Sequence, residues 1–346
     1  MMITVIVTTY NTEKYIAKCL DFLINQTFQD FDIIVVDDCS KDNTQKIILE
    51  YANKFSEKIK YIFMPQNTGA PANTRNKALD SGLITGKYII FLDGDDDIEN
   101  NFLEKLFITA ENNDADITFC GYERFDAETL KVYCKEMTNN KYQYLEKKDF
   151  DDDLAFFNTA FWNKLIRYDF IKDFRFKNVC GVDDPLFMID IYQYARKLAF
   201  TNDILIRYRV YNSSTINVHL VLDEMKKFRD ELVNIKQSYL NNNLIDIDIL
   251  TLFVFIHIGI SMPFRVYRNK LCNINEYIKL TKEYFDDNFS NWKKLKYLNL
   301  FYAFSKHGIK GLGLWGCRLL YKIGMFKLFL MFYLFLINKL NIDIKW

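Results

Sequence analysis

Paired cysteines and a surplus of one charge sign are both missing from this sequence. Its seven cysteines are odd in number, scattered and without a Cys-x-x-Cys pair, so the sequence predicts neither a disulfide framework nor a zinc site. We expect them to be reduced, as in a cytoplasmic protein. Lys and Arg together number 45, as do Asp and Glu, so no overall basic field favours a nucleic acid as partner.

Two nucleotide-binding motifs and a leader are also absent. No Gly-x-Gly-x-x-Gly follows the first apolar run and no Gly-Lys-Ser or Gly-Lys-Thr occurs, which argues against a dinucleotide dehydrogenase and a P-loop enzyme. The amino terminus has no basic leader and runs directly into the apolar residues 3–7. We therefore expect a first strand there and no signal peptide.

An apolar run that ends in four carboxylates dominates the first third of the chain. Residues 88–92 are Tyr-Ile-Ile-Phe-Leu, and Asp93, Asp95, Asp96 and Asp97 follow within five residues. This pattern predicts a strand buried on both faces, with Gly94 allowing a tight exit at the sheet edge. The carboxylates either form a solvated loop or helix cap, or bind a divalent cation that holds a phosphorylated ligand.

The first 215 residues alternate short β-rich runs with helical patterns. The chain has 346 residues and 50% hydrophobic content, enough for a sizeable core in one domain or two. The alternation predicts a mostly parallel α/β sheet. The predicted strands are 3–10, 31–36, 60–64, 88–92, 115–120 and 204–210. Three of them end in polar residues (9–11, 37–38 and 93–97), which should meet at one sheet edge because ligands bind there.

Past residue 220 the strand signals stop and the pattern is helical. Residues 251–262 are strongly apolar but shorter than the roughly 20 residues of a membrane span, so we expect a buried core helix. From residue 305 onward the sequence contains seven basic residues and a single acidic residue, Asp343, among many apolar and aromatic side chains. This favours an interfacial helix attracted to anionic lipid. The alternative is a helix that packs on the protein's own core or on a second subunit of a homo-oligomer.

Five motifs occur in order over about the first 215 residues. They are Val5-Ile6-Val7-Thr8-Thr9-Tyr10-Asn11, Gln26-Thr27-Phe28, the run 31–40 with Asp37-Asp38, Asn67-Thr68-Gly69 with Arg75-Asn76, and Phe91-Leu92-Asp93-Gly94-Asp95-Asp96. Together they resemble family 2 glycosyltransferases of the GT-A fold, of the bacterial capsule and lipopolysaccharide type. The resemblance implies a GT-A domain over residues 1–220, with nucleotide-sugar binding in 1–121 and the acceptor side and base in 122–220. It leaves residues 221–346 as a helical extension with a membrane-associating tail from about 305.

The resemblance implies roles for the donor-binding residues, which are Thr9, Tyr10, Asn11, Asp38, Asn67, Gly69, Arg75, Asp93, Gly94 and Asp95. Tyr10 is expected to stack on the nucleobase. Asp38 is expected to accept a hydrogen bond from a ring N–H, which favours uracil. The alternative role is to cap the helix that begins near residue 43, and the two roles do not exclude each other. Arg75 is expected near the diphosphate, where a guanidinium fits phosphate oxygens; otherwise it is an exposed helix residue.

The metal and the base follow from the same resemblance. Asp93 and Asp95 are expected to hold Mn²⁺ or Mg²⁺, with His219 either a third ligand or a packing residue. Asp183-Asp184-Pro185-Leu186-Phe187 resembles the family's Glu/Asp-Asp-x-x-Phe, so Asp184 is expected to be the general base, with Asp183 as its rival and a helix cap as the alternative. One base without a second nucleophile implies inversion.

The sequence is thus interpreted as an inverting, metal-dependent glycosyltransferase. Its donor is expected to be a UDP-sugar and its acceptor a lipid-linked surface glycan. The expected location is cytoplasmic, peripheral at the inner face of the cell membrane. Two alternatives stay open: an enzyme that acts directly on a polyprenyl phosphate, and a catalytically silent partner in a synthase complex.

Overall fold

The chain forms two compact units. The computed structural model describes residues 1–179, 181–210 and 222–340. Unit 1 comprises residues 1–149 and 158–231, and unit 2 comprises residues 150–157 and 232–346. The sequence placed a boundary near residue 220 but did not anticipate that the short segment 150–157 groups with the carboxyl-terminal unit.

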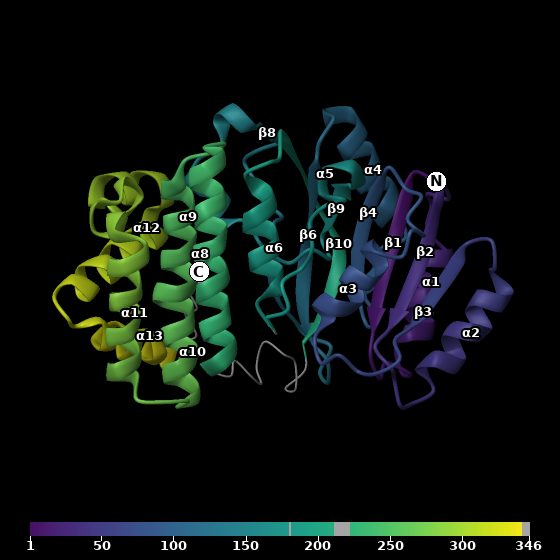
Figure 1. The fold of residues 1–346 in the computed structure, drawn as a ribbon, viewed down its shortest axis with the longest axis horizontal. Coiled ribbons are helices and arrows are strands. Elements are labelled where there is room, and N and C mark those ends of the chain that lie inside the picture. The colour runs from purple at the N-terminus through teal and green to yellow at the C-terminus, as the bar shows by residue number, and fades with distance from the viewer. Residues whose placement is uncertain (180, 211–221, 341–346) are drawn as a thin grey trace. The chain divides into compact units, whose positions relative to one another are not determined.

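A mixed sheet forms the centre of unit 1 (Figure 1). Its strands are β1 Ile3–Thr9, β2 Phe31–Asp37, β3 Ile59–Phe63, β4 Tyr88–Asp93, β5 Asp97–Ile98, β6 Ile117–Asp126, β7 Val132–Glu136, β8 Tyr144–Glu146, β9 Lys164–Arg167 and β10 Lys197–Val210. The main order is β3-β2-β1-β4-β9-β6-β10-β5. Strands β1 to β4 pair in parallel, as do β6 and β10, whereas β9 runs antiparallel between β4 and β6. The predicted α/β class is confirmed.

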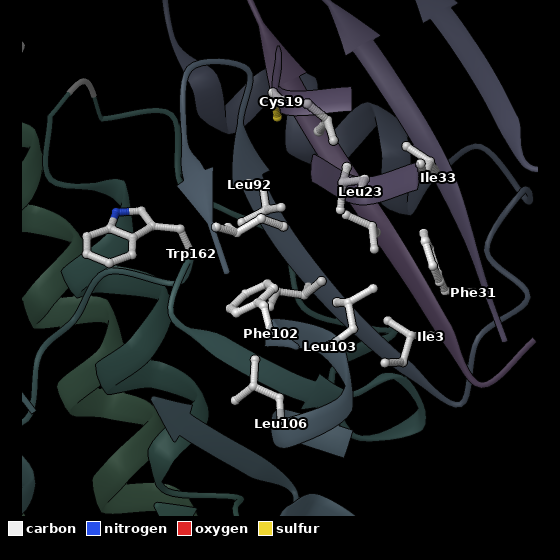
Figure 2. Packing of buried hydrophobic residues seen from close by; sticks show 14 of the residues in the cluster. Ile3, Cys19, Leu23, Phe31, Ile33, Leu92, Phe102, Leu103, Leu106 and Trp162 are labelled. Carbon is white, nitrogen blue, oxygen red and sulfur yellow. The ribbon is translucent and has the colours of Figure 1, made fainter. Parts of the chain in front are cut away.

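The central strands are apolar along their whole length because helices cover them. β1 and β2 are buried at every residue, as expected for parallel strands with both faces covered. The helical elements of unit 1 are α1 Ile16–Ile24, α2 Thr44–Lys54, α3 Pro71–Leu79, α4 Phe102–Asn113, η1 Lys147–Asp149, α5 Tyr168–Ile171 and α6 Asp183–Tyr192. Side chains of α1 and α4, among them Leu23 and Leu106, pack with Ile3, Ile33 and Leu92 (Figure 2). This packing fixes the strand ends that carry the polar residues.

All the secondary-structure elements among the described residues of unit 2 are helices. Its elements are η2 Asp152–Phe156, the end of α8 Leu222–Asn242, α9 Ile247–Val254, η3 Phe255–Ser261, α10 Met262–Asn269, α11 Ile274–Asn288, η4 Ser290–Lys294, η5 Lys296–Leu298, α12 Leu300–Lys322 and α13 Phe326–Leu340. The helical pattern predicted past residue 220 is confirmed.

The apolar segment near residue 255 is longer than the sequence suggested. α9, η3 and α10 follow one another as a continuous helix of 23 residues, Ile247–Asn269, which is long and apolar enough to cross a membrane. However, 72% of its most apolar window is buried within the protein. The expected length was therefore wrong, while the prediction of a buried core helix is confirmed by residues such as Leu252 and Ile256.

Candidate active site

Three polar strand ends meet at one edge of the sheet, as predicted. The register pairs Thr9 with Asp37 and Thr8 with Asp93. The backbone N–H of Asp38 donates to the carbonyl of Thr9 (2.9 Å), and Thr8 Oγ1 donates to Asp93 Oδ1 (3.1 Å). The sheet therefore brings segments from β1, β2 and β4 into direct contact.

The four aspartates at the end of β4 differ in their hydrogen bonds: Asp96 and Asp97 are held by the protein, whereas Asp93 and Asp95 stay accessible. Asp96 supports the turn, because its Oδ2 accepts from the Asp93 N–H (2.9 Å) and its own N–H donates to the Asp93 carbonyl (3.0 Å). Asp97 lies in β5 and accepts from Arg209 at 2.8 Å. Asp93 and Asp95 are left as the carboxylates with access to a ligand.

Gly94 is required by the close approach of β1. A Cβ atom at this position would lie 2.9 Å from Thr9 Oγ1 and 3.0 Å from Thr9 Cβ. Real Cβ contacts are almost never that short, so any side chain would push the turn away from β1. The absence of a side chain at residue 94 thus positions Asp95.

The two accessible carboxylates fit a divalent cation that also binds phosphate. Burial and the nearby charge of Asp93 raise the pKa of Asp95 to about 6, and this crowding of like charges is what a cation relieves. The described residues contain no group of three side chains able to hold a metal. Mg²⁺ commonly uses only one or two carboxylates and takes its other ligands from substrate phosphates and water, so two are sufficient. His219 lies outside the described residues.

Arg75 connects the acidic turn to the start of α6. Its guanidinium donates to Asp183 Oδ2 (2.8 Å) and Asp93 Oδ1 (3.1 Å), and it lies 3.8 Å above the centre of the Phe161 ring. Only 3% of Arg75 is exposed, so it is not a surface helix residue. Its Nε atom is buried and has no hydrogen-bond partner in the described structure.

Asp183 and Asp184 occupy the first turn of α6 in different surroundings. Asp183 is ion-paired with Arg75, and only 6% of its side chain is exposed. Asp184 Oδ1 lies 3.7 Å from the same guanidinium, and 27% of its side chain is exposed. No side-chain cap hydrogen bond marks the start of α6. Burial, followed by the charge of Asp183, raises the pKa of Asp184. Asp184 is thus the carboxylate able to reach a substrate.

Asp37 and Asp38 organise the loops beside the strand ends. Asp37 is fully buried and accepts from the Ser40 N–H (2.9 Å) and from Gln45 (2.6 Å). Asp38 accepts from Asn67 Nδ2 (3.0 Å) and from both the N–H and the hydroxyl of Thr68. Asp38 therefore holds the loop 64–70 in place.

The predicted capping alternative for Asp38 is wrong, because Asp42 performs that task. Asp42 Oδ1 accepts from the Thr44 N–H at the start of α2 (3.0 Å). In the loop 64–70, Gly69 has a φ of +73°, a conformation that favours glycine.

Tyr10 and Asn11 form the turn after β1. Tyr10 is 45% exposed, which leaves its ring face accessible to a base. Asn11 adopts a φ of +52°; its N–H donates to Ser40 Oγ (2.8 Å), and its Oδ1 accepts from the Lys41 N–H (2.8 Å). The turn is thereby tied to the loop after β2.

Two residues near the candidate base were not singled out as site residues. Phe161 lies under Arg75, and Lys164 at the start of β9 is fully buried with Nζ 2.8 Å from Asn163 Oδ1. Burial lowers the pKa of Lys164 to about 7, opposed by the charge of Asp184. Lys164 and Asp184 act on each other's charge although they come from separate elements, and this proximity became visible only in the tertiary structure.

An aromatic group lies on the same side of unit 1. Trp162 stacks on Tyr208 with ring centres 5.0 Å apart, and Tyr122 meets Trp162 edge-on at 4.7 Å. The negative charges of Asp93, Asp95 and Asp96 act on Tyr208, so this group adjoins the acidic turn. Trp162 and Tyr122 are buried, so this group supports the acidic turn from within unit 1 and offers no aromatic surface to a ligand.

Comparison with known proteins adds to this geometry. The sequence model of the family described as "Glycosyl transferase family 2" matches residues 4–174. The glycosyltransferase GlyG of Streptococcus pneumoniae serotype 4 is 29% identical over 238 residues, covering 64% of this chain and 75% of GlyG. The putative glycosyltransferase EpsH of Bacillus subtilis is 31% identical over 224 residues, covering 62% of each chain.

A third relative is similar in both sequence and structure. TarS of Staphylococcus aureus, a poly(ribitol-phosphate) beta-N-acetylglucosaminyltransferase, is 37% identical over 119 residues, covering 34% of this chain and 20% of TarS. The crystal structure of TarS 1–349 with UDP-GlcNAc matches with a TM-score of 0.73 at 22% identity, covering 94% of this chain and 92% of that one. This chain therefore shares the fold of TarS 1–349, and it matches about half (55%) of the longer TarS chain in a second crystal structure.

Proposed function

This chain is a member of glycosyl transferase family 2 with the GT-A fold, and we propose that it transfers a sugar from a UDP-sugar to a lipid-linked glycan, with inversion. The observation that carries the proposal is the position of Arg75. This single buried guanidinium contacts Asp93 of the acidic turn and both Asp183 and Asp184 of α6. A donor held at Asp93 and Asp95 thereby lies next to the candidate base.

The reaction is a single displacement. A hydroxyl oxygen of the acceptor attacks the anomeric carbon, the bond from that carbon to the diphosphate oxygen breaks, and its electron pair leaves with UDP. Asp184 takes the hydroxyl proton. Because one carboxylate acts and no covalent intermediate forms, the anomeric configuration inverts.

Asp93 and Asp95 are the residues that would hold a divalent cation near the leaving group. Mn²⁺ or Mg²⁺ held by Asp93 and Asp95 would neutralise negative charge on the diphosphate. Arg75 orients Asp93 through the contact at 3.1 Å, and Gly94 fixes the turn against β1. The protein therefore holds the carboxylates of Asp93 and Asp95 in a fixed position relative to the candidate base Asp184.

Uridine as the nucleoside is supported by two observations. The structure of TarS 1–349 contains UDP-GlcNAc, so the same fold in a relative accommodates a uridine donor. In this chain the exposed Tyr10 offers a ring on which a base can stack, and the backbone of the preceding Thr9 is hydrogen-bonded to that of Asp38, a carboxylate and hence an acceptor of the kind that the uracil ring N–H requires. A polymeric acceptor is supported by the name of TarS, which describes the transfer of N-acetylglucosamine to poly(ribitol-phosphate).

Calorimetric titration of the full chain tests the donor and the metal together. UDP-glucose, UDP-galactose and UDP-GlcNAc are compared with GDP-mannose, each with and without MnCl₂. We expect a UDP-sugar to bind in a manganese-dependent manner. Asp95→Asn should weaken this binding by at least about tenfold, because a cation ligand is lost.

Asp169→Asn is the matched control, since Asp169 lies in the same unit with 89% of its side chain exposed. It should bind donor as the wild type does. Equal manganese dependence in the wild type and in Asp95→Asn would refute the metal assignment. Preference for GDP-mannose would refute the uridine assignment without affecting the reaction class.

A further inference from the structure

Helix α13 is apolar on two opposite sides. Its inner side packs within unit 2, where Phe326, Leu330 and Tyr333 are buried and Phe326 stacks on Tyr321 at 3.9 Å. Its outer side exposes Leu328, Met331, Phe332 and Phe335, which follow one another at the i, i+3, i+4 and i+7 spacing of a single stripe. Helices that are apolar all round are normally covered on all sides.

The second half of α12 repeats this pattern. Gly308 has a φ of +56° and separates two helical segments. In the second segment Leu314, Cys317 and Tyr321 are buried, and the Tyr321 hydroxyl donates to the Gly259 carbonyl (2.7 Å). The exposed apolar side chains are Ile309, Leu312, Leu319 and Ile323. We call these four residues, together with Leu328, Met331, Phe332 and Phe335, the outer face.

The outer face is an unusual concentration of apolar surface for this protein. Half of the exposed large apolar side chains in the described structure lie between Phe301 and Phe335. Figure 1 shows α12 and α13 as the last helices of unit 2, coloured yellow-green to yellow. The inner contacts of both helices show that this segment is part of the folded unit. Its remaining apolar side therefore needs an external partner.

The charges around the outer face identify the chemistry of that partner. Lys310, Lys322 and Lys339 are exposed on the same two helices, and Lys327 precedes Leu328. From residue 305 onward there are seven basic residues and one acid, whereas the rest of the chain carries six more acidic than basic residues. A symmetric contact between two copies through this face would place lysines against lysines, which disfavours a second copy.

We propose that the outer face of α12 and α13 docks on the surface of an anionic lipid bilayer, with its apolar side chains in the headgroup region and its lysines on lipid phosphates. Apolar contact and charge attraction act together in such interfacial helices. The helices lie on the membrane without crossing it, because their inner sides are committed to the core of unit 2. The proposal rests on the surface alone and is independent of the donor chemistry.

Cosedimentation of the full chain with vesicles tests the proposal. Vesicles of phosphatidylcholine alone are compared with vesicles containing about one third phosphatidylglycerol. The test variant carries Leu328→Ser, Met331→Gln, Phe332→Ser and Phe335→Ser. Point changes are preferable to removal of the tail, because truncation would also remove Tyr321, Phe326 and other core residues.

The matched control carries Leu240→Ser, Leu244→Ser, Leu271→Ser and Leu280→Ser, four exposed apolar residues of the same unit. The wild type and the control should bind the anionic vesicles, and the test variant should bind at least about tenfold more weakly. A second variant with Lys310→Gln, Lys322→Gln and Lys327→Gln should lose about fivefold per lysine on anionic vesicles, with little change on neutral ones.

Three results would overturn the proposal. One is a wild-type protein that stays in the supernatant with anionic vesicles. Another is a test variant that binds as the wild type does. The third is a wild-type dimer that the test variant converts to a monomer in light scattering, which would assign the outer face to a second copy. Thermal unfolding of both quadruple variants checks that they fold, and the lysine variant tests the proposal if the apolar one does not.

Discussion

Asp183 and Asp184, at the start of α6, differ in burial and in their contact with Arg75. Asp183 is nearly buried and paired with Arg75, so its carboxylate is committed to the structure of the site. Asp184 has its Oδ1 at 3.7 Å from the guanidinium and stays partly exposed. These surroundings fit the proposed roles, with Asp183 as a positioning residue and Asp184 as the proton acceptor.

Replacement of Asp184 by Asn should abolish the transfer reaction and leave donor binding almost intact. Loss of a general base lowers the rate by roughly 10²–10⁴-fold, while the amide preserves the shape of the side chain. Asp183→Asn should instead lower stability by about 1–3 kcal/mol, because it breaks a buried ion pair with Arg75. Turnover and donor affinity are measured for both, and near-normal turnover in Asp184→Asn would exclude it as the base.

Replacement of Gly94 by Ala should destabilise unit 1 by about 1–3 kcal/mol through overpacking against Thr9. It should also weaken donor binding, since Asp95 follows directly. Gly316→Ala is the control: no atom lies within 4 Å of its added Cβ, so alanine should be neutral or stabilise α12 by up to about 1 kcal/mol. Urea unfolding measures both, and equal effects would show that the contact with β1 is unimportant.

Part of the candidate site could be predicted from local sequence patterns, and part depends on contacts between distant residues. Asp93, Asp95 and Tyr10 follow apolar strands directly, so their meeting at one sheet edge could be predicted. Arg75 and Asp183 are 108 residues apart, and no local pattern relates them. The hydrogen bonds from Asn67 and Thr68 to Asp38 could not be predicted either, because they join residues about 30 positions apart.

At the scale of elements, the segment η2 is held to α12 by a buried carboxylate. The Asp152 side chain is fully buried and accepts from Tyr302 (2.9 Å), Lys306 (2.5 Å) and His307 (2.7 Å). Burial alone would raise the pKa of Asp152, but the hydrogen bonds from His307 and Lys306 outweigh it and the pKa is lowered. This contact attaches residues 150–157 to unit 2.

Asp152→Asn should lower the stability of unit 2 by about 1.5–3 kcal/mol at pH 7, as expected for hydrogen bonds to a charged group. The pKa of Asp152 is lowered by folding, so its contribution is complete above the unfolded value of about 3.9 and is lost as the pH falls through the folded value. The difference between wild type and variant should therefore shrink below about pH 4. Urea unfolding across pH measures it, with exposed Asp287→Asn as the control; a pH-independent difference would contradict the linkage.

The element predictions succeeded where burial made the pattern continuous. β1, β2 and β4 are apolar runs with both faces covered, and their predicted ranges agree with the observed ones to within a residue or two. α4 was not predicted, although Phe102, Leu103 and Leu106 are all buried. β9 was also missed, because a strand of four residues inserted antiparallel between β4 and β6 has no periodicity of its own.

At the scale of the whole molecule, the two proposed tasks, donor binding and membrane docking, belong to different units. The residues around Arg75, Asp93 and Asp184 belong to unit 1, and the outer face belongs to unit 2. The sequence indicated this division through the change from alternating strands to helices. It could not indicate that residues 150–157 join unit 2, because η2 packs against α9 and Asp152 meets Tyr302, 150 positions later, and no local pattern relates these segments.

The two tasks should therefore be separable by mutation. The outer-face variant should bind UDP with Mn²⁺ as the wild type does, because none of its four substitutions lies in unit 1. Asp95→Asn should bind anionic vesicles normally while losing manganese-dependent donor binding. Calorimetry with UDP and cosedimentation with vesicles, applied to both variants, give four measurements, two unchanged and two reduced. If the outer-face variant also lost affinity for UDP although it remained folded, membrane docking and donor binding would be coupled, and the assignment of one task to each unit would be wrong.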